Sequence, residues 1–181
     1  MSRTIEVGRI RDNLAAIEAG FADAMASTEL EKGTILSAMF SKLAVLELCG
    51  WLEQTIDRIL YHYVNVTISN RQLRNTIKEQ VIDTVYGFKY AKELKPLFMK
   101  ILGAARFNHI LRVLGRKGQD EILLSCIQKL NRERNVAAHT YWNDKAQQHF
   151  DAPSCTYQEF LTLVPIVTEI DKCIKQFARH H

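Results

Sequence analysis

The chain has 181 residues, of which 47% are hydrophobic and 24% are charged, and its formal net charge is +4. These values are ordinary for a folded soluble protein that is long enough to bury a core without disulfides or metals. The mild positive charge permits a nucleic-acid partner without demanding one. The spacing of the four cysteines excludes the zinc-finger and Cys-x-x-Cys classes, so we expect no structural metal.

The start and the hydropathy of the chain predict a cytoplasmic protein. The opening residues, MSRTIEVGRIRDN, are too polar for a signal peptide. No apolar run approaches the roughly 18 residues that a membrane span needs. We therefore expect no membrane partner, and we expect the cysteines to be reduced.

The first predicted element is a helix over residues 4–30. Its apolar residues recur at three- and four-residue steps, which puts them on one face of a helix. These residues are Ile10, Leu14, Ile17, Phe21 and Met25. Gly33 ends this helix or interrupts its pattern. We expect residues 1–32 to form an N-terminal helical arm and residues 33–181 to form the main helical domain.

The segment over residues 34–64 is the most hydrophobic, and its wide apolar face predicts the central buried helix. Ser69 and Gln72 have the spacing of a capping box, which predicts a helix from there through Val85. Lys95-Pro96 predicts the first turn of a short helix over residues 95–102.

Three further helices are expected over residues 104–114, 119–139 and 156–178, where the helical periodicity of apolar residues continues. Signals of β-hairpins are absent from the sequence. The predicted fold is therefore an all-α helical bundle with a long central helix and an N-terminal helical arm.

The densest polar cluster, RERNVAAHT at residues 132–140, falls at the end of the helix predicted over residues 119–139. Residues four apart share a helix face, so Asn135 is expected beside His139, and Arg132 on the same stripe. Arg134 lies to one side, and it converges on the histidine if the helix frays near Ala138. Arginine binds phosphate oxygens, and histidine exchanges protons near neutral pH. The cluster therefore suits a phosphodiester substrate.

From spacing alone, Arg134 and His139 also fit a simpler role, because cations stabilise the negative end of a helix dipole. The residues Arg134-Asn135-Val136-Ala137-Ala138-His139, however, resemble the Arg-(Asn/Asp/His)-x3-His signature of HEPN domains, in the form of the RiboL-PSP-like branch. The resemblance covers roughly residues 35–178, although only the motif is specific.

The resemblance implies a HEPN-like bundle acting as a metal-independent, cofactor-free endoribonuclease, either a toxin or an antiviral effector. Arg134 and His139 are then the catalytic residues, Asn135 orients the site, and the 2′-hydroxyl of the RNA attacks. Arg132 also satisfies a family spacing, so the choice of arginine stays open. A homodimer with two facing motifs, and an antitoxin or another defence-system protein, are the implied partners. Because some members only bind RNA or a protein, a non-catalytic adaptor is the alternative.

Three residues outside the motif, Glu47, Arg132 and Tyr141, are expected to support it. Glu47 is the single charge in the run LAVLELCGWL, and a buried carboxylate needs a partner. We expect that partner to be an arginine of the motif, with an ion pair elsewhere as the alternative and Glu53 as the alternative acid. Arg132 is expected to bind the RNA backbone and Tyr141 to stack on a base, although packing at the helix end is equally open for Tyr141.

Overall fold

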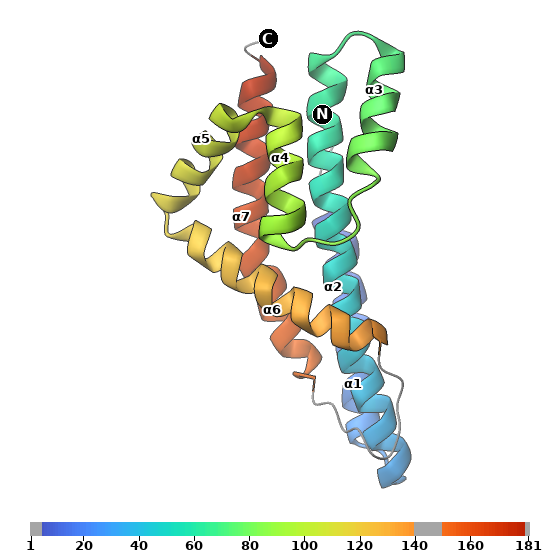
Figure 1. The fold of residues 1–181 in the computed structure, drawn as a ribbon. Helices are drawn as coiled ribbons and strands as arrows, with labels where there is room; N and C mark the ends of the chain where they lie inside the picture. Colours follow the sequence, from blue (N-terminus) through green and yellow to red (C-terminus); the bar gives the residue numbers. More distant parts are fainter. Residues whose placement is uncertain (1–4, 140–149, 180–181) are drawn as a thin grey trace. The chain divides into compact units, whose positions relative to one another are not determined.

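The structure is a computed structural model that describes residues 5–139 and 150–179, and helices are the regular secondary structure found in them (Figure 1). The predicted all-α class is confirmed. The elements, in chain order, are α1 (Val7–Met25), α2 (Leu30–Thr67), α3 (Arg71–Ile77), the π-helices η1 (Lys78–Ile82) and η2 (Tyr90–Leu94), α4 (Lys95–Leu102), α5 (Ala104–Gly115), α6 (Gln119–His139) and α7 (Pro153–Arg179).

Several helix boundaries differ from those predicted, and two of the differences concern a predicted start or stop signal. Gly33 neither ends nor interrupts a helix, because it lies inside α2. Glycine at this position allows α2 to lie close to α1, because a Cβ atom there would come within 2.6 Å of the carbonyl oxygen of Ala24 in α1. The expected capping box at Ser69 is also wrong. Asn70 is the N-cap of α3, and its side chain accepts a hydrogen bond from the backbone N–H of Leu73.

The chain divides into two compact units, and neither is a single continuous segment. Unit 1 contains Leu52–Gln128 and the chain from Leu163 onward, whereas unit 2 contains Glu6–Trp51 and Lys129–Thr162. Helix α1 and the first half of α2 belong to the same unit, so the expected boundary at residue 32 falls inside unit 2.

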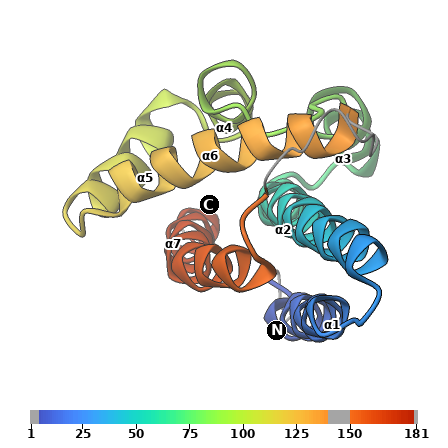
Figure 2. The same cartoon turned by 90° about the horizontal axis from the view of Figure 1, so that it is seen from below.

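Unit 2 begins with α1 and the first half of α2, which run side by side (Figure 2). The indole N–H of Trp51 donates to the carbonyl of Glu6 at 3.1 Å, which ties the end of this half of α2 to the start of α1. The Trp51 ring also meets Phe160 of α7 edge-on, with 5.2 Å between ring centroids. The Cys49 thiol donates to the Leu130 carbonyl of α6 at 3.8 Å, so all four helices contribute to this core.

Unit 1 packs the second half of α2 with α3, α4, α5, the first part of α6 and the end of α7. The rings of Phe98 in α4 and Phe107 in α5 stack with 5.5 Å between centroids. These rings border an apolar cavity of about 30 Å³ that Leu52, Leu114 and Val167 also line. An ion pair of 2.9 Å between Lys117 and Glu169 joins the turn after α5 to α7.

By length and composition alone, α2 is apolar enough to cross a membrane. Its residues Ala44, Leu48, Leu52 and Leu60 are nevertheless buried within the protein. The core helix of a soluble protein meets the same criterion, so this finding is weak evidence for a membrane span.

Candidate functional site

The motif occupies the last two turns of α6 in unit 2. His139 is the final residue of that helix and is exposed, as is Arg132, whereas Arg134 and Asn135 are half-buried. Ala137, between Asn135 and His139, is only 1% exposed, so the last turn is packed against the protein rather than frayed. The predicted position of the motif at a helix end is confirmed.

Because α6 stays helical through His139, the directions of the motif side chains follow from helix geometry. At about 100° per residue, Arg132 points within about 20° of His139 and Asn135 within about 40°. The predicted common stripe of these three residues is therefore present. Arg134 points about 140° away from His139, so the fraying that would bring the two together near Ala138 does not occur in this structure.

Arg134 instead lies on the flank of α6 that faces the core. It is four residues after Leu130 and three before Ala137, and both of those side chains are buried. This placement explains why Arg134 is half-buried while Arg132 is exposed. Arg132, Asn135 and His139 therefore form the more exposed side of the motif, which we call the exposed strip.

A cluster of charged residues is centred on Lys129 of α6, with further members before and within α7. The ammonium group of Lys129 donates to Asp151 Oδ2 at 2.8 Å and to Glu159 Oε1, and lies 3.6 Å from Glu133 Oε1. Burial alone would lower the pKa of Lys129, but the hydrogen bonds to Asp151 and Glu159 hold that pKa well above its ordinary value. Burial also raises the pKa of Glu133, against the attraction of Lys129. We call these four residues the Lys129 cluster.

The expected partner of Glu47 is wrong. Glu47 is half-buried, and its Oε2 accepts a hydrogen bond from the side-chain amide of Asn13 at 3.0 Å. Glu47 lies seven residues after Phe40 and so on the same helix face. A Cβ atom added at Gly20 of α1 would come within 2.5 Å of the Phe40 ring, so α1 already covers that face. The hydrogen-bond partner of Glu47 in this structure is therefore a residue of α1, not the expected arginine of the motif.

Tyr141 lies outside the described residues. Within residues 5–139 and 150–179, no group of three or more histidines, cysteines or acids is arranged to hold a metal ion. Sequence reasoning missed the Lys129 cluster, because its members are separated by up to 30 residues and none belongs to a motif. The acidic residues Asp151 and Glu159 flank the start of α7, and no local pattern links them to Lys129.

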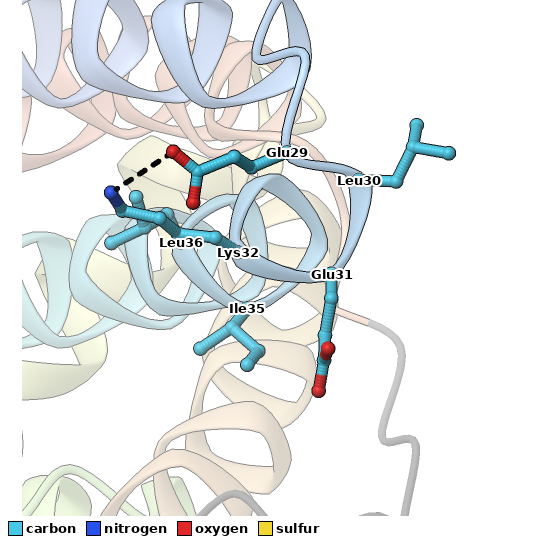
Figure 3. A pocket seen from close by; sticks show the side chains of 6 residues that line it. All are labelled: Glu29, Leu30, Glu31, Lys32, Ile35 and Leu36. Carbon is cyan, nitrogen blue, oxygen red and sulfur yellow. Dashed lines mark ion pairs between the residues drawn. The ribbon is translucent and has the colours of Figure 1, made fainter.

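A surface hollow of about 440 Å³ lies at the start of α2 and was also not expected. Its six lining side chains point in different directions rather than toward a common centre (Figure 3). Leu30 is 82% exposed, and the single ion pair among the six joins Lys32 to Glu29 at 3.7 Å. Such a shallow hollow lacks convergent polar groups and is not a candidate active site.

No family model matches the chain, and the comparisons with curated proteins and with solved structures found no similar protein. The motif and the helix that carries it are therefore the observations that bear on function.

Proposed function

We propose that the chain is a HEPN-like, metal-independent endoribonuclease that works without a cofactor. The observation that carries this proposal is the Arg134-Asn135-x3-His139 motif at the exposed end of a helix in an all-α fold. We further propose a cytoplasmic toxin or antiviral effector, with an antitoxin or another defence-system protein as partner.

The proposed reaction needs only the RNA and the motif. His139 removes the proton from a 2′-hydroxyl, whose oxygen then attacks the adjacent phosphorus. The bond to the 5′-oxygen breaks, and that oxygen takes up a proton, leaving a 2′,3′-cyclic phosphate and a 5′-hydroxyl. An arginine holds the phosphate and stabilises the charge that develops on its oxygens. Asn135, on the histidine's side of α6, orients the site.

A homodimer is part of this proposal for a geometric reason. Arg134 and His139 point about 140° apart on one helix, so a single copy presents the histidine but not Arg134 on its exposed strip. Two copies of α6 facing a common cleft would offer two histidines and two Arg132 side chains to one RNA strand. Arg132, which shares the exposed strip with His139, binds the backbone in this arrangement.

The test is cleavage of total RNA and tRNA by the purified protein in the presence of EDTA. We expect cleavage with cyclic-phosphate ends, a loss of about 100- to 10,000-fold in His139→Ala, and a loss of about 100- to 1,000-fold in Arg134→Ala. Arg132→Ala should act mainly on RNA affinity and its salt dependence. His62→Ala, which changes a half-buried histidine of α2 outside the motif, is the matched control and should cut normally.

Two outcomes would change the proposal. If Arg132→Ala is the inactive variant and Arg134→Ala cuts normally, the arginine of the exposed strip is the catalytic one. If the wild type cuts no RNA under any condition but still binds RNA or a protein partner, the chain is the non-catalytic adaptor instead.

A further inference from the structure

We infer that Lys129 is a positioning residue of the proposed ribonuclease, and that its ion pairs hold the motif-bearing end of α6 against the start of α7. This inference rests on the proposed function for its kinetic consequence, but its structural consequence can be measured independently. Lys129 itself has no place in the reaction, because its ammonium group is already engaged by Asp151, Glu159 and Glu133.

The cluster joins three separate parts of unit 2. Lys129 and Glu133 are one turn apart on α6, Asp151 lies two residues before the start of α7, and Glu159 lies in the second turn of α7. The contacts to Asp151 and Glu159 span 22 and 30 residues of the chain. One ammonium group therefore fixes α6 to both the start and the second turn of the next helix.

The burial of its members sets this cluster apart from an ordinary surface ion pair. The side chains of Glu133 and Glu159 are only 18% and 14% exposed. Carboxylates so far out of water need a cation, and exposed pairs contribute little by comparison. Three carboxylates share the single Lys129 ammonium. Removal of that one positive charge therefore breaks all three ion pairs together.

The location of the cluster suits a clamp rather than a contact with RNA. Lys129 is ten residues before His139, which is about 15 Å along the axis and about 80° around it. The Lys129 ion pairs therefore fix α6 without covering the exposed strip. Near the motif, the Leu130 carbonyl accepts from the Cys49 thiol and Ala137 is buried, and the Lys129 ion pairs add a further contact between α6 and its neighbours.

The experiment compares Lys129→Met with Lys129→Arg by steady-state RNA cleavage and by amide hydrogen exchange. Lys129→Met should lower kcat by about 10- to 100-fold, because small misplacements of a catalytic group have effects of that size. KM should stay nearly constant, since Lys129 does not touch RNA. Amides of residues 134–139 should exchange faster, and Lys129→Arg should restore both properties. Asp151→Asn removes one carboxylate from the exposed edge and should give a smaller change of the same kind.

Lys175→Met is the matched control, because Lys175 is equally exposed and its ion pair with Asp171 is confined to α7. It should leave kcat and the exchange at residues 134–139 unchanged. The inference is overturned if exchange there is the same in Lys129→Met as in the wild type, if KM rises while kcat holds, or if arginine fails to restore kcat. A wild type that cuts no RNA overturns the proposed function, and the exchange measurement still decides the role of Lys129.

Discussion

Asp57, half-buried on α2, is a carboxyl group that the folded chain holds against ionisation. Burial, together with the negative charges of Asp83 and Glu53, raises the pKa of Asp57 from 3.8 to about 6, against the opposing charge of Lys78. A raised carboxyl pKa means that folding favours the protonated form. The resulting stability is fully present below about pH 4 and is lost as the pH rises through about 6.

Asp57→Asn should therefore stabilise the protein at pH 7–8 and have no such benefit at pH 4. The shift from 3.8 to about 6 corresponds to about 3 kcal/mol, and solvent screening of a half-exposed group reduces the expected gain to about 1–2 kcal/mol. Urea unfolding between pH 4 and pH 8 measures this difference. Asp23→Asn, on the exposed surface of α1, should show no gain, and a pH-independent effect of Asp57→Asn would contradict the argument.

Which side chains of the site could be predicted depended on how local their contacts are. The common stripe of Arg132, Asn135 and His139 follows from helix geometry alone, and α6 preserves it. The partner of Glu47 was predicted wrongly, because it comes from Asn13, 34 residues away in the chain. Spacing within one helix contains no information on which other helix covers a given face.

At the scale of helices, apolar periodicity and helix-start signals together predicted a helix at each α-helix of the described residues, and α4 begins and ends where Lys95-Pro96 and Leu102 indicated. The π-helices η1 and η2 could not be predicted in this way. Their hydrogen bonds skip one residue more than those of an α-helix, and over a single turn the apolar pattern is nearly the same. Pro153 as the first residue of α7 fits the preference of proline for that position, although the helix was expected to begin at Thr156.

The packing of α1 against α2 depends on Gly33. A Cβ atom at that position would lie 2.6 Å from the Ala24 carbonyl oxygen and 3.2 Å from the Ser27 Cβ, so backbone must move to admit it. Gly33→Ala should destabilise the protein by about 1–3 kcal/mol, the usual cost of overpacking. Gly50 is the matched control in the same helix, because nothing lies within 4 Å of a Cβ added there.

Gly50→Ala should stabilise the protein by about 0.5–1 kcal/mol, since alanine loses less backbone entropy than glycine in a helix. Chemical denaturation of both variants beside the wild type measures the contrast. Equal effects of the two substitutions would show that the approach of α1 to α2 is not limited by this glycine.

For the whole molecule, the proposed function requires a two-fold dimer with the motifs near its axis. Light scattering should give a mass of about twice the 20.8 kDa of one chain. In a Cys155→Ser background, which removes the exposed thiol, Ala138→Cys should form an inter-chain disulfide, because Ala138 is exposed beside His139. Lys100→Cys, on the surface of α4, is the control and should not cross-link. A monomer, or cross-linking at Lys100 alone, would contradict the proposed dimer.

The core of unit 2 is built from two segments of the chain that the ribosome synthesises at different times. Trp51 meets Phe160, and Cys49 meets the Leu130 carbonyl, so its core needs both Glu6–Trp51 and Lys129–Thr162. Thr162 is added about 110 residues after Trp51, a delay of roughly 6 to 20 s at 5–20 residues per second. During that time the nascent α1 and α2 have apolar faces without their later partners. During synthesis of this chain there is therefore an interval in which the apolar faces of α1 and α2 are uncovered. Binding of a chaperone in that interval would keep these first helices soluble until α6 and α7 are made.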